Sequence, residues 1–319
     1  MNPIENTTEL LQPGQESNVG YPEASACHAW PEEERENDGA CLDGWKTPSF
    51  EDDARKPRPF IKWAGGKARL LPQLYPFVPA TWGTYHEPFV GGGAMFFGLR
   101  PRRAVLSDTN PELIHCYEIV RDNVDGVIDE LKKHRYDKGL FYAVRAQEPS
   151  TLTPPARAAR FIYLNKTCFN GLHRVNRKGE FNVPFGAYKN PQICDEPNLR
   201  ACSAALQGVT ILLSPFETVV TRAVAGDFVY FDPPYLPISA TSSFTAYTAD
   251  GFSLPDHVLL RDVALELKAR GVGVLISNSA SPAVIQLYSD GFEIERVGVN
   301  RAINSKGHQR GKIEEVIIH

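Results

Sequence analysis

The sequence predicts an α/β fold, in which helices cover the faces of a largely parallel sheet and a segment of helices with a β-hairpin is inserted. Two observations support this fold class. From residue 58 onward, short apolar runs that end in Gly or Asp alternate with helical segments, which is typical of a parallel sheet. Residues 111–207 instead favour helices and a Gly-punctuated, basic hairpin, and the apolar runs resume after them. We therefore expect one α/β domain that carries an insertion.

The first predicted strand covers residues 86–90 and runs into Gly91-Gly92-Gly93, after which a helix begins at Ala94. A second apolar run, residues 104–108, predicts a buried strand that ends in an acid, Asp108. Apolar side chains at three- and four-residue spacing predict one helix over residues 111–135. Its first residue is a proline, which suits the first turn of a helix.

A further helix is expected over residues 155–169, where the apolar side chains lie near one stripe. The Gly-punctuated stretch that follows contains Arg-Lys-Gly-Glu at residues 177–180, which we expect at the tip of a hairpin. A helix is also predicted over residues 253–270. The later apolar runs predict strands at residues 210–213, 227–231, 272–277, 292–297 and 313–318.

The composition indicates an intracellular protein of ordinary globular size. With 319 residues, 42% of them hydrophobic, the chain can bury a sizeable core as one large domain or two modest ones. Its six cysteines form no C-x-x-C pair and no Cys/His cluster with zinc spacing, so we interpret them as reduced thiols. No apolar stretch approaches about 20 residues, the length that spans a bilayer, and residues 1–20 lack the pattern of a secretion signal. We expect a cytoplasmic protein with no membrane association.

Charge is distributed unevenly along the chain. Of the 38 acidic and 34 basic residues, 13 and 4 lie in residues 1–56, which leaves 25 and 30 in residues 57–319. The net charge is therefore −9 for the amino-terminal extension and +5 for the remainder. Because residues 1–56 are also rich in Glu, Asn, Pro and Gly, we expect most of them to be disordered or loosely docked. The alternative is an acidic tail that competes with DNA for a basic groove.

The tetrapeptide Asp232-Pro233-Pro234-Tyr235 follows the apolar run 228–231, where a buried strand should stop. Two prolines cannot continue a sheet ladder or donate N–H groups, so nearby backbone carbonyls stay free to accept hydrogen bonds. Asp232 adds an anionic acceptor, and Tyr235 offers a ring on which a base can stack. The combination suits a flat, amine-bearing base. The competing interpretation is a strand-ending turn whose Asp caps the next helix.

The glycine turn at residues 91–93 allows the backbone to approach a ligand closely, at the strand-to-helix position favoured for nucleotide-like cofactors. Asp108 is placed to accept hydrogen bonds from ribose hydroxyls. Both features also occur in NAD-binding domains, although the dinucleotide fingerprint requires a glycine where Phe96 stands. A purely structural tight turn is a third interpretation. Residues 62–67 do not form a phosphate loop, because Ile61 and Ala68 replace the glycine and the hydroxyl residue that such a loop requires.

Together these features resemble the Dam-type DNA adenine methyltransferases, the D12 class or alpha group of amino methyltransferases, which transfer a methyl group from S-adenosylmethionine to adenine N6. The resemblance covers residues 58–319, and residues 1–56 lie outside it. The motifs that carry it are Lys62 to Lys67, Glu87 to Gly93, Asp108 with Asn110, Phe161 to Asn165, Asn170 to Leu172, Gly179 to Gly186, Asp232 to Tyr235, Ser239 to Thr241, Phe244 to Tyr247 and Ile276 to Asn278.

The resemblance implies a Rossmann-like, S-adenosylmethionine-dependent methyltransferase domain, residues 57–110 with 208–319, and an inserted helical and β-hairpin DNA-recognition domain, residues 111–207. It assigns cofactor binding to Trp63, Lys67, Phe89, Gly91, Gly93, Asp108 and Asp232. It also implies recognition of GATC in double-stranded DNA. The DNA-binding positions are Lys62, Phe169, Asn170, Leu172, Arg174, Pro184 and Tyr188, with Arg177 and Lys178 as phosphate contacts or solvated surface. Phe169 stands where relatives often have Tyr, and His173 departs from the common pattern.

For the reaction, we predict that the Asp232 side chain and the Pro233 carbonyl accept the two amino hydrogens of an extruded adenine, so that the nitrogen lone pair faces the methyl group. With a reference pKa of about 3.9, an Asp is too weak a base to deprotonate an aromatic amine beforehand. No metal is required, and we expect a monomer with no obligate protein partner. The alternatives are methylation of cytosine N4, RNA or a protein amide, a catalytically silent DNA-binding regulator, and a nicotinamide-dependent oxidoreductase.

Overall fold

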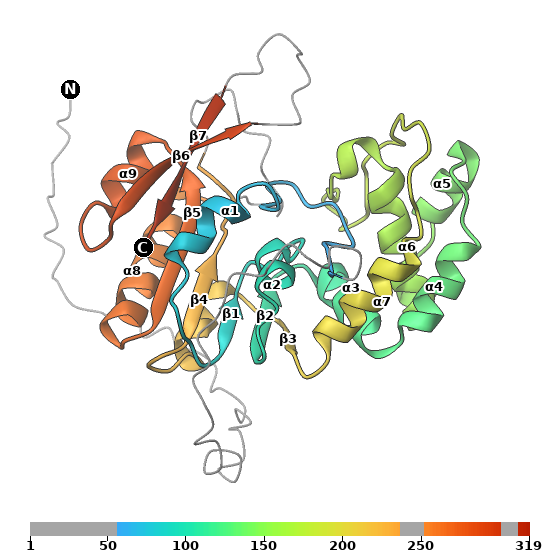
Figure 1. The fold of residues 1–319 in the computed structure, drawn as a ribbon. Helices are drawn as coiled ribbons and strands as arrows, with labels where there is room; N and C mark the ends of the chain where they lie inside the picture. The colour runs from blue at the N-terminus through green and yellow to red at the C-terminus, as the bar shows by residue number, and fades with distance from the viewer. Residues whose placement is uncertain (1–55, 237–251, 301–311) are drawn as a thin grey trace, which may run out of the picture. The chain divides into compact units, whose positions relative to one another are not determined.

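Apolar runs that end in polar or glycine residues form the strands of one mixed sheet. The computed structural model describes residues 56–236, 252–300 and 312–319. The strands are β1 Tyr85–Glu87, β2 Ala104–Asp108, β3 Thr210–Leu213, β4 Phe228–Phe231, β5 Gly273–Ser279, β6 Ile294–Asn300 and β7 Lys312–Ile318. Their order in the sheet is β3-β2-β1-β4-β5-β7-β6 (Figure 1). The first five strands thus follow the 3-2-1-4-5 order of doubly wound nucleotide-binding folds.

Strand β7 departs from the predicted parallel arrangement. Strands β3, β2, β1, β4 and β5 are parallel to their neighbours, whereas β7 is antiparallel to both β5 and β6. A parallel partner for β6 would need a crossover of about a dozen or more residues, usually a helix. Residues 301–311 are too few for such a crossover, so the chain returns antiparallel.

Two further predictions about the amino-terminal half were wrong in detail. The strand expected over residues 86–90 ends at Glu87, because Pro88 cannot donate to a ladder and the chain turns toward Gly91. The helix expected over residues 111–135 is two helices, α3 Pro111–Asp122 and α4 Val124–Lys132. Asn123 separates them: its backbone is non-helical, and its side chain accepts a hydrogen bond from the amide of Gly126 and so caps α4.

The other helices are α1 Leu71–Leu74, α2 Ala94–Leu99, α5 Lys138–Arg145, α6 Pro154–Thr167, α7 Glu196–Leu206, α8 Leu254–Ala269 and α9 Pro282–Tyr288. Helices α6 and α8 confirm the helices predicted over 155–169 and 253–270, to within two residues. The sequence patterns did not predict α1, α5, α7 or α9. The hairpin tip is confirmed, since Val175 bridges Phe181 and the amide of Gly179 donates to the carbonyl of Asn176 at 2.9 Å.

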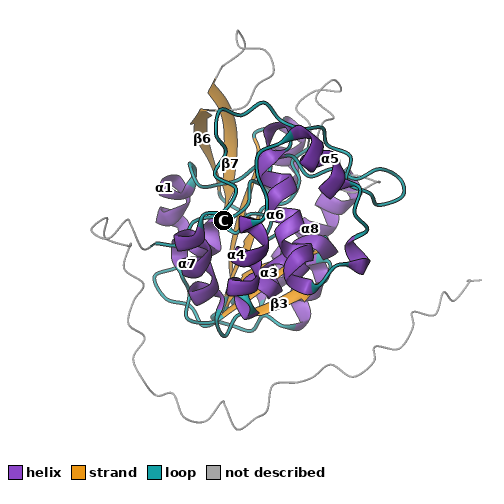
Figure 2. Ribbon diagram, turned by 90° about the vertical axis from the view of Figure 1, so that its right-hand side faces the viewer, coloured by secondary structure: helices purple, strands orange, loops and turns teal. Residues whose placement is uncertain are grey.

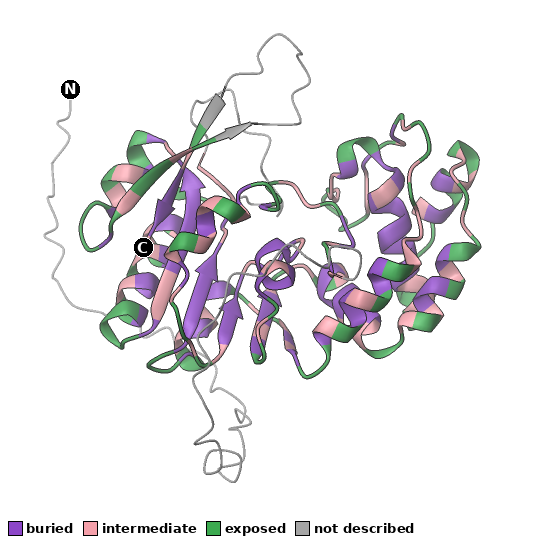
Figure 3. Ribbon diagram, viewed as in Figure 1, coloured by how far each residue is buried: buried purple, intermediate pink, exposed green. Residues whose placement is uncertain are grey.

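Alternating side chains of the central strands fill two cores, one on each face of the sheet. In β4 every residue is buried: Phe228 and Tyr230 pack with α2, α3 and the helices beyond them, whereas Val229 and Phe231 pack with α8 and α9. Such a fully apolar strand is expected where helices cover both faces. Figure 3 shows β4 as buried along its length, and Figure 2 shows α3, α4 and α6 in front of the strands in that view.

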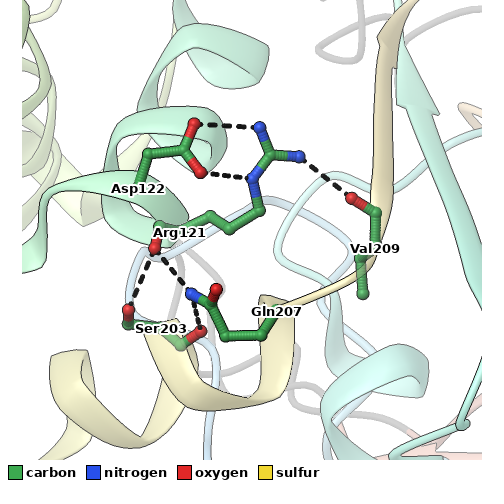
Figure 4. A network of polar contacts seen from close by, with 5 residues as sticks. All are labelled: Arg121, Asp122, Ser203, Gln207 and Val209. Carbon is green, nitrogen blue, oxygen red and sulfur yellow. Dashed lines mark hydrogen bonds and ion pairs between the residues drawn. The ribbon is translucent and has the colours of Figure 1, made fainter.

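Hydrogen bonds of Arg121 anchor the helical segment between β2 and β3 to the sheet. Helix α3 follows β2, and α7 precedes β3, so these two helices connect the sheet to α4, α5 and α6. Arg121 at the end of α3 donates to the carbonyl of Val209 at 2.9 Å, just before β3. In return its own carbonyl accepts hydrogen bonds from the side chains of Ser203 and Gln207, at 3.2 and 2.8 Å (Figure 4). These hydrogen bonds therefore fix the positions at which the helical segment leaves and rejoins the sheet.

Candidate active site

The strand order reverses between β1 and β4, which are hydrogen-bonded neighbours. In open α/β sheets the region outside the carboxyl ends of the strands at such a point is the usual ligand site. The glycine turn follows β1, and the Asp232-Pro233-Pro234-Tyr235 segment follows β4. The fold therefore brings the two motifs predicted from the sequence to adjacent strand ends.

The glycine turn is packed so closely that side chains are excluded from it. At Gly91 the backbone has φ +45°, and a Cβ there would lie 2.6 Å from Cδ1 of Trp63. At Gly93, φ is +66° and a Cβ would lie 2.6 Å from the hydroxyl of Tyr117. That hydroxyl donates to the carbonyl of Gly91 at 3.1 Å. The turn is thus held from both sides, with the Trp63 ring lying directly on it.

Asp108 ends β2 and contacts the same turn. Its Oδ2 accepts a hydrogen bond from the amide of Gly91 at 3.2 Å, and its Oδ1 accepts one from the amide of Asn110 at 3.0 Å. Burial raises the pKa of this carboxyl group to about 6, against the lowering effect of these amide donors. Each carboxylate oxygen can accept a second hydrogen bond, so the group remains able to bind a hydroxyl donor.

Phe89 lies in a cluster of aromatic rings beside the turn. Its ring stacks on Phe216 at 5.3 Å between centroids and meets Phe252 edge-on at 5.7 Å. Sequence reasoning did not identify Phe216 or Phe252. The position of Phe216, three residues beyond the end of β3, is the signal that could have found it, because β3 lies beside β2 in the sheet.

Asp232 forms an ion pair with a buried lysine. Nζ of Lys67 lies 2.8 Å from Oδ1 of Asp232 and also donates to the carbonyl of Gly65. The hydroxyl of Ser277 donates to the same Oδ1 at 2.8 Å and shares a hydrogen bond of 2.9 Å with Tyr230. Burial raises the pKa of the Asp232 carboxyl group above its ordinary value, while Lys67 and Ser277 act to lower it. The structure thus places Lys67, for which the resemblance implies cofactor binding, on Asp232.

Tyr235 is oriented by a residue from the antiparallel strand β7. Its hydroxyl donates to Oε2 of Glu315 at 2.9 Å, and Nζ of Lys67 lies 4.6 Å from the centre of its ring. Sequence reasoning assigned no role to Glu315 or to Ser277. Ser277 could have been found from strand register, because Phe231 pairs with Ile276 and the next residues are Asp232 and Ser277. Pro233 is buried and Pro234 partly buried beside them.

A second acid lies beneath the turn. Glu87, the last residue of β1, is buried, and its Oε2 accepts hydrogen bonds from the hydroxyl of Tyr85 at 2.8 Å and from the amide of Phe96 at 3.1 Å. Burial raises its pKa to about 8, and the nearby Asp232 charge contributes in the same direction. Three carboxyl groups, those of Glu87, Asp108 and Asp232, therefore stand at the ends of β1, β2 and β4.

The predicted DNA-binding residues gather around the end of α6 and the hairpin. Nζ of Lys62 lies 4.0 Å from the centre of the Tyr188 ring. The amide of Phe169 donates to the carbonyl of Pro184 at 2.8 Å, while the Phe169 side chain is 47% exposed. Asn170 is exposed with φ +55°, in the left-handed region. The hydroxyl of Tyr188 donates to the carbonyl of Cys168 at 2.8 Å, so these five residues form one group that includes the exposed Phe169 ring.

The remaining predicted contacts lie along the hairpin. Arg174 is exposed, and its Nε donates to Oδ1 of Asn182 on the opposite arm at 2.6 Å. Leu172 is partly buried, and its amide donates to the carbonyl of Phe169 at 3.2 Å. Arg177 and Lys178 are exposed at the hairpin tip. A base contact by Arg174 would therefore require its guanidinium group to exchange Asn182 for the base.

Some predicted features fall outside the described residues, namely residues 1–55 and the motif segments 239–241 and 244–247. Within residues 56–236, 252–300 and 312–319, no group of three or more His, Cys, Asp or Glu side chains is arranged to hold a metal ion. In that same part of the chain, no helix has the length and apolar character needed to cross a membrane.

Comparison with known proteins decides the family. The sequence model of the D12 class N6 adenine-specific DNA methyltransferases matches residues 63–303. The chain belongs to this family. A type II methyltransferase of Lactococcus lactis subsp. cremoris is 44% identical over 269 residues, which cover 82% of this chain and 94% of the relative. A type II methyltransferase of Methanocaldococcus jannaschii is 42% identical, covering 79% and 95%, and the DNA adenine methylase of Haemophilus influenzae is 37% identical, covering 82% and 93%.

Family membership confirms the predicted enzyme class. The protein is an adenine-specific DNA N6 methyltransferase with an α/β fold, and DNA is its substrate. The nicotinamide-dependent oxidoreductase weighed from the glycine turn is therefore excluded. The matched range, residues 63–303, includes the glycine turn, Asp108, the hairpin and Asp232 to Tyr235.

Proposed function

We propose that the enzyme transfers the methyl group of S-adenosylmethionine to N6 of an adenine that is flipped out of double-stranded DNA, within the sequence GATC. One observation carries this proposal: the glycine turn after β1 and Asp232 after β4 lie at adjacent strand ends, at the point where the strand order reverses. A cofactor in the first motif and a base at the second would therefore be neighbours.

The residues around the turn fit S-adenosylmethionine. A Cβ at Gly91 or Gly93 would collide with Trp63 or Tyr117, so only glycine allows the turn and the Trp63 ring to pack together this closely. Asp108 would accept hydrogen bonds from ribose hydroxyls, and Trp63 and Phe89 would provide aromatic surface. With a pKa of about 6, the Asp108 carboxyl group is ionised at neutral pH, which suits a ligand that carries a positively charged sulfonium and an ammonium group. When bound, S-adenosylmethionine supplies an electrophilic methyl group.

Asp232 would act on the adenine as a hydrogen-bond acceptor. Lys67 and Ser277 both contact Oδ1, and we assign Oδ2 to one hydrogen of the adenine amino group. The backbone carbonyl of Pro233 would accept the other. With both hydrogens held, the nitrogen can become more tetrahedral and direct its lone pair at the methyl group. The proton then leaves during or after transfer, because a carboxylate is too weak a base to remove it beforehand.

Extrusion of the adenine costs a few kcal/mol. Stacking on Tyr235 would offset part of this cost, since base–aromatic stacking contributes about 1–3 kcal/mol. The hydrogen bond to Glu315 fixes the orientation of that ring in advance.

We assign recognition of the target sequence to the hairpin and the end of α6. Arg174 would form a bidentate contact with guanine, worth about 1–3 kcal/mol of discrimination. Phe169 would insert its exposed ring into the duplex, with Lys62, Asn170, Leu172, Pro184 and Tyr188 around it. We further propose residues 111–207 as the recognition domain, residues 57–110 with 208–319 as the catalytic domain, and a cytoplasmic enzyme that acts as a monomer without a metal.

Methylation of a mixed duplex library, followed by mapping of the modified adenines, tests the proposal. We expect methyl groups on adenine N6 within GATC, dependent on S-adenosylmethionine. Mapped modification in another sequence would contradict the GATC assignment and leave the chemistry intact. Full methyl transfer by Asp232→Ala would contradict the role given to that carboxylate, with Asp262→Ala on the surface of α8 as the matched control.

A further inference from the structure

His173 lies between the residues proposed to bind the cofactor and those proposed to read DNA. Its ring stacks on Trp63, with 5.5 Å between centroids and 23° between planes. Phe161 of α6 packs against the ring at 5.5 Å, and Phe181 of the opposite hairpin arm packs at 5.8 Å. Three aromatic rings from three parts of the chain therefore hold His173 in one orientation.

A hydrogen bond fixes the same ring from the sheet side. Asn110 caps α3, with its Oδ1 accepting from the amide of Leu113 at 3.0 Å, so its Nδ2 is the atom that faces His173. The distance from this Nδ2 to Nδ1 of His173 is 3.3 Å. Burial lowers the pKa of His173 to about 4, so the imidazole is neutral at neutral pH and its Nδ1 can accept.

Each partner of His173 on the sheet side touches the glycine turn or Asp108. Trp63 lies on Gly91, where a Cβ would approach Cδ1 to 2.6 Å. The amide of Asn110 donates to Asp108, and Asp108 accepts in turn from the amide of Gly91. A ligand bound at the turn would therefore press on, or order, both groups that hold the histidine.

On the side of the proposed DNA contacts, His173 itself belongs to the hairpin segment to which we assign recognition of the target sequence. It lies between Leu172 and Arg174 in the chain, and it contacts Phe181, whose neighbour Asn182 binds Arg174. Displacement of the His173 ring would thus shift Arg174 and both hairpin arms. The contacts form one continuous packed path from Asp108 to Arg174, and His173 lies where its two halves meet.

We propose that His173 is a positioning residue that couples the two substrates, so that bound cofactor strengthens DNA binding and bound DNA strengthens cofactor binding. The inference rests on the proposed function of both regions. Coupling between two sites is reciprocal, so the same factor must describe the effect in either direction, and a factor of about 5–150 is typical.

The coupling factor is measured by titration calorimetry with S-adenosylhomocysteine, in the absence and presence of a saturating GATC duplex. For the wild type we expect the dissociation constant of S-adenosylhomocysteine to fall about tenfold when the duplex is present. His173→Ala, which removes the ring and the acceptor, should bring this factor close to one. His173→Phe keeps an aromatic ring on Trp63 and loses the contact with Asn110, so its factor should be intermediate.

Lys178→Ala is the matched control, because Lys178 is exposed at the tip of the same hairpin. It should weaken DNA binding and leave the coupling factor at the wild-type value. A wild-type factor of one, or an unchanged factor in both His173 variants, would overturn the proposal. Failure of the wild type to bind S-adenosylhomocysteine at all would instead overturn the proposed cofactor, and the coupling with it. Melting temperatures identify a variant that is merely unfolded, in which case the second His173 variant decides.

Discussion

Nζ of Lys67 lies 2.8 Å from Oδ1 of Asp232, although the two residues come from the segment before α1 and the end of β4. The lysine side chain is only 6% exposed, so water has little access to its ammonium group and does not take its place beside Asp232. Together with the hydroxyl of Ser277, it occupies one oxygen of the carboxylate that we assign to the adenine amino group. The ion pair therefore sets the protonation state and the orientation of Asp232 before substrate binds.

Replacement of Lys67 by methionine should change the pH dependence of methyl transfer. Burial raises the pKa of Asp232 and Lys67 lowers it, so loss of the ammonium group should raise that pKa further. Since the carboxylate is the active form, the acidic limb of the kcat/KM profile, which reports the free enzyme, should move to higher pH. Activity at neutral pH should fall by about tenfold or more, as expected for a hydrogen bond to a charged group. The other ionisable groups around Asp232 are Tyr85, Glu87, Tyr230, Tyr235 and Glu315.

Lys67→Arg is the control for this experiment, because it retains a positive charge. It should keep the acidic limb close to its wild-type position. If Lys67→Met instead weakened the binding of S-adenosylhomocysteine and left the pH profile unmoved, Lys67 would be a cofactor-binding residue and the role given to the ion pair would be wrong.

Ser277→Ala should lower kcat and leave cofactor binding unchanged. The Ser277 hydroxyl donates to Oδ1 of Asp232 at 2.8 Å, and hydrogen bonds to charged groups contribute about 1.5–3 kcal/mol. A loss of about 10- to 150-fold in kcat follows from that range. Single-turnover kinetics and calorimetry with S-adenosylhomocysteine separate the two quantities. Ser289→Ala, on the surface after α9, provides the control, and equal kcat values for both variants would contradict the prediction.

The sequence predicted those parts of the site that depend on local structure. A glycine turn, an acid at a strand end and a Pro-Pro break can each be identified within a few residues, and Gly91, Asp108 and Asp232 all lie at the ends of neighbouring strands. Ser277 and Glu315 were not assigned roles, because they contact Asp232 and Tyr235 across 45 and 80 residues of chain. Those contacts depend on strand order, and on the antiparallel return of β7, which the apolar pattern of β7 does not reveal. The break at Asn123 was missed for a different, local reason, since the apolar spacing continues across it.

Gly91→Ala should weaken cofactor binding and destabilise the fold. The φ of +45° at Gly91 disfavours any side chain, and the new Cβ would lie 2.6 Å from Cδ1 of Trp63, which must then move. Gly179→Ala is a matched control, because Gly179 has φ +79° with no atom within 4 Å of the added Cβ. Backbone strain of about 1–3 kcal/mol should appear in both melting curves, whereas only Gly91→Ala should lose affinity for S-adenosylhomocysteine. Equal affinity in both variants would show that Trp63 and the turn do not form the cofactor site.

Glu87→Gln should gain stability relative to the wild type as pH rises. The pKa of Glu87 is about 8 in the folded protein and 4.5 as its ordinary value, so between these values the folded state binds more protons than the unfolded state. The stabilising contribution of protonated Glu87 is complete below pH 4.5 and is lost as pH rises through 8. Glutamine keeps an acceptor for Tyr85 and Phe96 but does not titrate. The difference in the free energy of unfolding between Glu87→Gln and the wild type should therefore grow by up to about 1.4 kcal/mol for each pH unit in this window.

Urea titrations at several pH values measure this difference, with Glu293→Gln on the surface as the control. A pH-independent difference for Glu87→Gln would show that the pKa of Glu87 is not raised.

Arg174→Ala and Lys178→Ala should weaken DNA binding in different ways, although both residues are exposed on one hairpin. Arg174 donates to Asn182 on the opposite hairpin arm, and loss of the bidentate guanine contact that we assign to Arg174 should cost about 1–3 kcal/mol on GATC alone. Specificity at that base pair should relax, because altered sites never had the contact to lose. Lys178 is exposed at the tip, and we expect it to contact phosphate, so its loss should weaken binding to all sequences alike and reduce the slope of log affinity against log salt by about 1. Binding of GATC and single-substituted duplexes at several salt concentrations gives both quantities. Equal losses for Arg174→Ala on all duplexes, with a reduced salt slope, would make Arg174 a phosphate contact and leave the base reading to other residues around Phe169.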